Sequence, residues 1–437
     1  MIKAKKMRYI ITSAQRNAGV NKGLLRNMQN FAKKHKVDKI LFFPMRGKFI
    51  EEDRLDPLLM DFEMIDKLRL NSNLMLKSIE ALPQQIDPFF GLSGKFSRDY
   101  SHIIPSPKIR YRSIANTSKY PRALMTTGAI TKPNYKMHTR IGQLANEQHQ
   151  YGFVYVEIVD DKIFNARQIE ATDNGDFYFL TEKYYDGKVY REKPEALVLG
   201  DWHVGDTCPK VRVESIKMVR QLKPRRLVFH DLFNGYSINH HEEDSLLAEL
   251  RSVRDMKFGL EKEMREVYNE LTYFATLFKD VEMVVVRSNH DDFLERYIKD
   301  KKFVKHPQNF LFACKLIPQI LDERKVPLEE GLRLIGEIPR NVRFVNQDDT
   351  YRVRGVELGM HGHLGVSGAK GSPRQFSRLN LKAITGHTHS PELMANGMVV
   401  GTSTKLRLPY THGASSWLNA HGILYANGKY GLLTLIL

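Results

Sequence analysis

The chain has 437 residues, 42% of them hydrophobic, which is enough material for two or three domains with buried cores. Lys plus Arg number 67 and Asp plus Glu 50, so the formal net charge is +17, which favours a polyanionic partner such as nucleic acid or an anionic membrane surface. The two cysteines, Cys208 and Cys314, are too few for a disulfide framework and indicate a reducing compartment.

The N-terminal half begins with a basic segment whose apolar stretch is too short for a signal sequence or a transmembrane segment, so we expect a soluble, cytoplasmic protein. Residues 7–45 predict strands over 7–14 and 39–44 joined by an amphipathic helix over 21–35. A long helix is expected over 56–82, before Pro83. From about residue 103 to 190 apolar and polar residues alternate with a period of two, which indicates an antiparallel meander.

A charged segment, residues 189–197 with Pro194 inside it, is the best candidate for a domain boundary. We therefore expect an N-terminal mixed α/β domain over 1–194, serving substrate binding or oligomerisation, and a second domain over 195–437. In the second domain strands and helices alternate, the longest helical pattern running from 245 to 279. The C-terminus alternates with period two around a hairpin signal at Asn427–Gly428, and no repeat is visible in the sequence.

Four predicted strands in the second domain end in polar side chains of the kind that bind metals, in the segments ALVLGD, RRLVFHD, MVVVRSNHDD and KAITGHTH. Ligands of α/β folds bind outside the carboxyl ends of strands, so one pocket should collect Asp201, His203, Asp231, Asn289, His290, His387 and His389. Imidazole, carboxylate and amide groups without thiolates suit Mn²⁺, Fe or Zn²⁺ in a hydrolytic site. The set is too large for one ion and suits two that share a bridging carboxylate.

The order of these motifs resembles the calcineurin-like metallophosphoesterase superfamily. The motifs are Asp201-Trp202-His203, His230-Asp231-Leu232-Phe233-Asn234-Gly235, Ser288-Asn289-His290-Asp291, His361-Gly362-His363 and Gly386-His387-Thr388-His389. The resemblance covers residues 195–437 and implies a β-sandwich flanked by helices. It also implies two divalent ions. Mn²⁺ is favoured over Mg²⁺ because imidazole-rich sites bind Mg²⁺ poorly, and Mg²⁺, Fe and Zn²⁺ are the alternatives.

Each site residue takes its role from this resemblance. One ion would be held by Asp201, His203, Asp231 and His389, and the second by Asp231, Asn289, His361 and His387. A hydroxide bridging the two ions would attack phosphorus. His290 is implied as the general acid or transition-state stabiliser, and Asp291 is suited to orient its imidazole. His363 remains an alternative to His361.

Two positions depart from the usual pattern of the superfamily. His230 and Ser288 stand where glycine usually precedes the bridging Asp and the Asn ligand. Because glycine is favoured where the backbone takes a positive φ or approaches closely, the local geometry there is an open question.

Other residues near the motifs have a functional and an ordinary interpretation. Arg287, Arg374 and Arg378 could clamp phosphates or form surface pairs, and Trp202 and Trp417 could stack a base, although packing is favoured for both. His240 and His241 could reach substrate, but a solvated loop is favoured.

The substrate is predicted from charge, from the large N-terminal domain and from a C-terminal segment that resembles bacteriophage-encoded DNases of the superfamily. DNA is the expected partner, and a phage-encoded enzyme of this kind would degrade host DNA in the host cytoplasm. The alternatives are a phosphodiesterase or phosphatase acting on nucleotides or phosphoproteins, and a nonenzymatic DNA-binding protein that keeps the metal site as structure. Homo-oligomerisation stays open.

Overall fold

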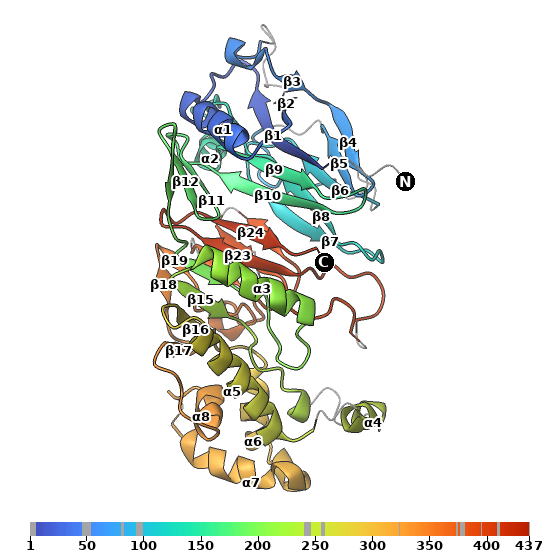
Figure 1. Ribbon diagram of the computed structural model, residues 1–437, viewed down its shortest axis with the longest axis vertical. Helices are drawn as coiled ribbons and strands as arrows, with labels where there is room; N and C mark the ends of the chain where they lie inside the picture. The colour runs from blue at the N-terminus through green and yellow to red at the C-terminus, as the bar shows by residue number, and fades with distance from the viewer. Residues whose placement is uncertain are drawn as a thin grey trace.

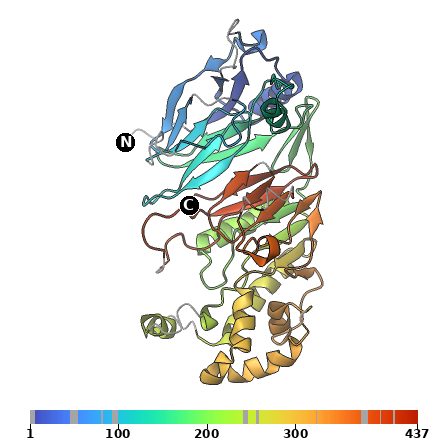
Figure 2. The same cartoon turned by 180° about the vertical axis from the view of Figure 1, so that it is seen from behind.

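The computed structural model describes residues 6–45, 54–79, 83–92, 99–239, 246–254, 258–322, 324–372, 375, 381–394, 396–408 and 411–436. The protein is mixed α/β, as predicted. An N-terminal half, blue to green in Figure 1, lies above a C-terminal half, green to red, and the view from behind in Figure 2 shows the same division. No helix in the described ranges is long and apolar enough to span a bilayer.

The N-terminal half contains a five-stranded sheet in the order β10-β9-β1-β2-β3. Its strands are β1 (Met7–Gln15), β2 (Lys39–Met45), β3 (Glu63–Met64), β9 (Gly152–Ile158) and β10 (Phe164–Glu170). The strand-helix-strand prediction is confirmed, because β1 and β2 pair in parallel and α1 (Lys22–Lys34) connects them. A small sheet of β11 (Phe177–Phe179), β12 (Glu182–Tyr185) and β13 (Lys188–Arg191) packs with α1 against the outer face.

The long helix expected over 56–82 was wrong. The described part of this segment contains the short 3-10 helix η1 (Pro57–Leu59), β3, β4 (Lys67–Asn71) and β5 (Leu74–Lys77). Leu74 and Leu76 are fully buried while their neighbours are half-buried, so the burial has period two and the segment pairs as strands. Residues 80–82 lie outside the described residues.

The C-terminal half contains a six-stranded sheet in the order β17-β16-β15-β14-β23-β24. Its strands are β14 (Ala196–Val198), β15 (Arg226–Phe229), β16 (Glu282–Val286), β17 (Val342–Val345), β23 (Ala420–Leu424) and β24 (Tyr430–Thr434). The first four are mutually parallel, and β23 and β24 form the predicted hairpin around Asn427–Gly428.

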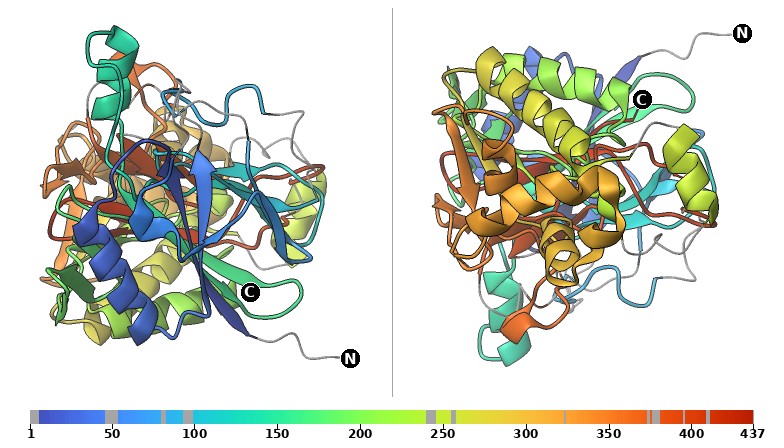
Figure 3. Two further views of the ribbon diagram at one scale, coloured as in Figure 1. Left: turned by 90° about the horizontal axis from the view of Figure 1, so that it is seen from above. Right: turned by 90° about the horizontal axis from the view of Figure 1, so that it is seen from below.

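Helices cover one face of this sheet, and the view from below in Figure 3 shows several of them in front of it. The described helices of this half are α3 (Pro209–Leu222), α4 (Leu246–Arg254), α5 (Leu260–Leu277), α6 (Asp291–Lys299), α7 (Pro307–Leu316), α8 (Pro327–Arg333), and the 3-10 helices η2 (Tyr236–Ile238), η3 (Lys302–Lys305), η4 (Ile317–Gln319) and η5 (Val366–Gly368). The helical pattern expected over 245–279 is therefore two helices, α4 and α5. Leu197 and Leu199 face the helices, while Ala196 and Val198 face the opposite side.

A ten-stranded sheet backs both halves, in the order β18-β19-β20-β22-β21-β7-β8-β6-β5-β4. Its remaining strands are β6 (Ser101–Ile104), β7 (Tyr111–Ile114), β8 (Arg122–Thr126), β18 (Arg352–Val353), β19 (Val356–Glu357), β20 (Ala383–Thr385), β21 (Glu392–Met394) and β22 (Gly397–Val399), and α2 (Arg140–Glu147) follows β8. One apolar core joins it to the five- and six-stranded sheets. Strands from both sides of the expected boundary at 194 thus share one sheet.

Candidate metal centre

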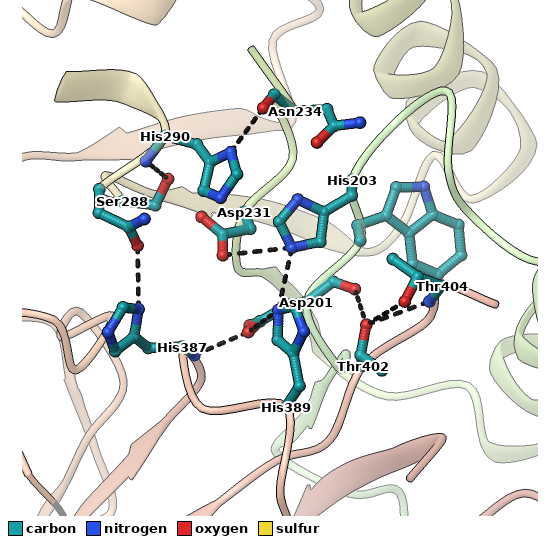
Figure 4. Close-up of polar contacts among 12 residues, drawn as sticks. Asp201, His203, Asp231, Asn234, Ser288, His290, His387, His389, Thr402 and Thr404 are labelled. Atoms are coloured by element: carbon teal, nitrogen blue, oxygen red, sulfur yellow. Dashed lines mark hydrogen bonds and ion pairs between the residues drawn. The ribbon is translucent and has the colours of Figure 1, made fainter. Parts of the chain in front are cut away.

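The polar side chains of the motifs gather at one edge of the six-stranded sheet. Because β14, β15 and β16 are parallel, the segments that follow them begin at the same edge, and these segments carry Asp201, Asp231 and Asn289. The segment after β20 adds His387 and His389 from the ten-stranded sheet. The two sheets therefore deliver their ligand-type residues to one place (Figure 4).

The first group consists of Asp201, His203, Asp231 and His389, all of them buried. One ligand atom from each lies within 4.8 Å of the others. His203 Nε2 lies 3.1 Å from His389 Nε2 and 3.4 Å from Asp231 Oδ2. His389 Nε2 lies 3.1 Å from Asp201 Oδ2. Two imidazole nitrogens and two carboxylates converging in a buried site form a donor set that fits a divalent cation.

A second group adjoins the first through Asp231. His361 Nε2 lies 3.3 Å from Asp231 Oδ2 and 3.0 Å from Asn289 Oδ1. His387 Nδ1 lies 3.0 Å from the same Asn289 oxygen. His363 Nε2 lies 3.4 Å from Asp292 Oδ2, and its ring centroid lies 5.4 Å from that of His361 and 6.1 Å from that of His387. Asp231 therefore stands between two clusters of nitrogen and oxygen atoms, with its carboxylate in reach of both.

Several buried polar atoms of this site lack a hydrogen-bond partner within the described part of the protein. They include Asp201 Oδ1, Asp231 Oδ1 and Nδ1 of His203, His361 and His389. Unsatisfied buried carboxylate oxygens cost about 1–3 kcal/mol each or more, so such groups persist where a ligand compensates them. The residues present fit bound cations.

The charges of the site also suit cations. Burial alone would raise the pKa of Asp231, but the facing rings of His361 and His290 hold it well below its usual value. Burial lowers the pKa of His203 well below its usual value, so this ring stays neutral and keeps a lone pair. An ionised carboxylate and a neutral imidazole are the forms that bind metals.

Four of the converging residues have left-handed backbones. The φ angles are +47° at His203, +45° at Asp231, +77° at His387 and +58° at His389. Such a conformation costs a non-glycine residue about 1–3 kcal/mol. Backbone hydrogen bonds hold the first two, because His203 N donates to Asp231 O at 2.7 Å. The residues on either side of His203 make similar bonds, from Trp202 N to His230 O and from Val204 N to Leu232 O. Strain gathered at one set of side chains indicates a functional site.

His290 contacts a backbone carbonyl rather than Asp291. Its Nδ1 donates to the Asn234 carbonyl oxygen, which leaves Nε2 as the nitrogen that faces the site (Figure 4). Asp291 instead accepts from Ser288 N at 2.9 Å and closes the turn that presents Asn289 and His290. The expected orienting role of Asp291 is thus corrected, because the Asn234 carbonyl makes that contact.

The two residues that stand where the superfamily usually has glycine do not have a backbone conformation that requires glycine. Neither His230 nor Ser288 has a positive φ. The His230 ring is fully buried, with its centroid 5.5 Å from that of His361, and Ser288 Oγ accepts from His290 N at 3.2 Å. The open question about local backbone geometry is answered by ordinary backbone at both positions.

The flanking residues mostly have structural contacts. Arg287 is buried and donates to Asp292 and Glu295, while Trp202 is fully buried and donates to Glu270. The Trp417 ring, in contrast, lies 4.2 Å from the His389 ring, beside the site. The other candidates, Arg374, Arg378, His240 and His241, lie outside the described residues.

Sequence reasoning missed the role of Asn234. Its carbonyl binds His290, and its Nδ2 donates to Asp206 Oδ2 at 2.8 Å, so the side chain fixes the backbone that orients the ring. The second motif contains Asn234, but the pattern there offered no sign that a main-chain atom would make the contact.

The fold and the site define an α/β protein with a buried group of Asp and His residues suited to holding metal. No protein-family model matches the chain. The chain is similar to Protein A1 of Escherichia phage T5, with 28% identity over 457 residues, covering 98% of this chain and 81% of that protein. A solved structure aligns at 13% identity over 56% of this chain and 100% of its own, with a TM-score of 0.25, which is too low to support any argument about the fold.

Proposed function

We propose that the protein is a two-metal phosphodiesterase of the calcineurin-like metallophosphoesterase superfamily that hydrolyses DNA. The observation that carries this proposal is the position of Asp231, whose Oδ2 lies 3.4 Å from His203 Nε2 on one side and 3.3 Å from His361 Nε2 on the other. The pairing of a helix-covered six-stranded sheet with the ten-stranded sheet over a common core supports the superfamily's sandwich, with residues 195–437 as the catalytic domain.

Two divalent ions, with Mn²⁺ favoured, would supply a water of lowered pKa and neutralise charge on the phosphate. Asp201, His203, Asp231 and His389 would hold one ion, and Asp231, Asn289, His361 and His387 the other. The Asn234 carbonyl fixes the proton of His290 on Nδ1, so Nε2 is free to face the substrate. A proton carried on Nε2 can then pass to the leaving oxygen. Asp291 holds the turn that places His290 there.

DNA is the proposed substrate on two grounds. The net charge of +17 suits a polyanion whose binding weakens with salt. Similarity to a phage protein over nearly the whole chain is in keeping with degradation of host DNA in the host cytoplasm.

The proposal is tested by incubating purified protein with supercoiled, linear and single-stranded DNA in Mn²⁺, Mg²⁺ or EDTA. We expect cleavage with Mn²⁺, weaker cleavage with Mg²⁺ and none in EDTA. Asp231→Asn serves as the inactive variant. Intact DNA together with cleavage of bis-p-nitrophenyl phosphate would refute the nuclease and favour a phosphodiesterase or phosphatase acting on smaller substrates. Bound metal without turnover on either substrate would refute the enzyme altogether.

A further inference from the structure

The N-terminal half repeats the strand order of the catalytic half. The order β10-β9-β1-β2-β3 corresponds to β24-β23-β14-β15-β16, with β17 added at the far edge. In the ten-stranded sheet β4-β5-β6-β8-β7 corresponds to β18-β19-β20-β22-β21, and each matching pair is parallel or antiparallel alike. Helix α1 follows β1 as α3 follows β14. The strands of the three larger sheets, apart from β17, therefore form two copies of one topology.

The two copies meet as a local twofold axis requires. Tyr111 pairs with Met125 in the first copy, and Leu393 with Met398 in the second. Tyr111 and Leu393 thus have the same place in their copies, and they lie opposite each other in the antiparallel β7–β21 pair. Self-pairing of equivalent residues is the mark of an isologous contact. The axis reverses strand direction, so the carboxyl ends of the two parallel sets open at opposite ends of the sheets.

Individual contacts give the residue correspondence. Ser13 bridges Ala129 in parallel, as Asp201 bridges Thr402. Ile130 N donates to Ser13 O and Ser403 N to Asp201 O. The next pair of bonds runs from the N-cap residues of α1 and α3, with Asn21 N donating to Ile130 O and Cys208 N to Ser403 O. The copies therefore match bond for bond at the place where the catalytic half carries Asp201.

The metal-ligating residue types are absent from the equivalent described positions of the first copy. Ser13 and Gln15 correspond to Asp201 and His203. Ile104 lies opposite Thr126 in the first copy as Thr385 lies opposite Val399 in the second, so Ile104 and Thr385 are equivalent. Counting onward from these two residues, Ser106 corresponds to His387 and Lys108 to His389. Lys108 is buried, and its Nζ donates to the carbonyl oxygens of Gln84 and Gln85. A lysine ammonium at the place of a histidine ligand disfavours a cation there.

A cavity of about 530 Å³ opens at this place in the first copy. It is enclosed by the segments that follow β1, β5 and β8, which are the equivalents of those that carry His203, His361 and Trp417 in the other half. Its described lining contains the cationic or titratable side chains of Arg16, Tyr135, Lys136 and His138 and the amides of Gln15, Asn17, Gln84 and Asn134, without a carboxylate.

We propose that this cavity is a metal-free binding site for a nucleotide phosphate, formed when one copy of a duplicated fold lost its ligands. Arg16 and Lys136 supply charge for the phosphate, and the amides offer both donors and acceptors to the edge of a base. The volume lies within the range of about 300–1,000 Å³ of ligand pockets. The ligand is a free nucleotide or the terminal nucleotide of a strand, which share this chemistry.

The test is binding by the full chain in EDTA, where no hydrolysis takes place. Two probes are used. Binding of dAMP is measured by calorimetry, and binding of a fluorescent 5′-phosphorylated single-stranded decamer is measured by fluorescence anisotropy. Arg16→Ala and Lys136→Ala should each raise the Kd about tenfold, as expected for loss of a charge-assisted hydrogen bond. The matched control is Lys132→Ala, an exposed lysine of the same segment that does not line the cavity.

Weakening by Arg16→Ala and Lys136→Ala but not by Lys132→Ala supports the site. If these two variants weaken binding of dAMP, the ligand is a free nucleotide. If they weaken binding of the decamer alone, the ligand is the end of a strand. Equal affinities for all four proteins, or no binding of either probe to the wild type, would overturn the proposal. Asp231→Asn should bind as the wild type does in EDTA, so failure of this site and failure of the nuclease proposal give different results.

Discussion

Acid should destabilise the C-terminal half through one buried histidine, His421 on β23. Its Nδ1 accepts from Gly200 N at 2.9 Å, directly before Asp201, and its Nε2 lies 2.7 Å from Ser215 Oγ on α3. Ser215 Oγ donates its only proton to Val211 O, so Nε2 must carry the ring proton. A second proton on Nδ1 would face the Gly200 N–H. The ring is therefore built to be neutral.

The size of the effect follows from the shift in pKa. Burial lowers the pKa of His421 from 6.5 to about 4. Between these values the unfolded chain binds more protons than the folded one, so stability rises with pH and is lost as pH falls below about 6.5. Linkage gives a loss of about 2 kcal/mol between pH 7.5 and pH 5 from this group alone.

The assay is urea unfolding followed by tryptophan fluorescence, in EDTA to exclude the pH dependence of metal binding. Trp202 and Trp417, the two tryptophans, both lie in the C-terminal half, so the signal reports that half. His421→Asn keeps an acceptor near Gly200 N but does not titrate. The wild type should lose about 2 kcal/mol more than this variant between pH 7.5 and pH 5. A difference between the two proteins that stays constant with pH would refute the reasoning.

Three further substitutions test the candidate metal centre. Asp231→Asn should weaken Mn²⁺ binding at least about 100-fold and abolish cleavage, checked by metal titration and DNA assay; retention of both metals would contradict a shared ligand. His290→Gln should lower kcat by about 10²–10⁴ while bound metal, measured by mass spectrometry, stays at the wild-type level; a parallel loss of metal would make His290 a ligand instead. Gly386→Ala would place a Cβ 2.1 Å from Asp201 Oδ1. It should cost about 1–3 kcal/mol in unfolding and weaken metal binding, and a variant with wild-type affinity and stability would show that Asp201 is free to move.

Local chemistry in the sequence was enough to predict that Asp201, Asp231 and Asn289 come together at the candidate metal centre. Asp201, Asp231 and Asn289 follow buried apolar runs, and a buried parallel strand can be recognised from such a run alone. The carboxyl ends of parallel strands share an edge, so convergence followed without knowledge of the rest of the fold. The first strand-helix-strand unit and the Asn427–Gly428 hairpin were predictable for the same reason, since their signals lie within a few residues.

Tertiary structure alone decided the features that depend on distant pairing. Residues 67–77 became strands because β6 lies beside them, not because of their own helical spacing. The Asn234 carbonyl at His290 is a main-chain contact, which side-chain motifs do not encode. The duplicated topology left no visible sequence repeat, because a fold is maintained by burial and hydrogen bonding that many sequences satisfy. The paired strands, with Tyr111 opposite its equivalent Leu393, display the repeat, because backbone pairing can be the same where the side chains differ.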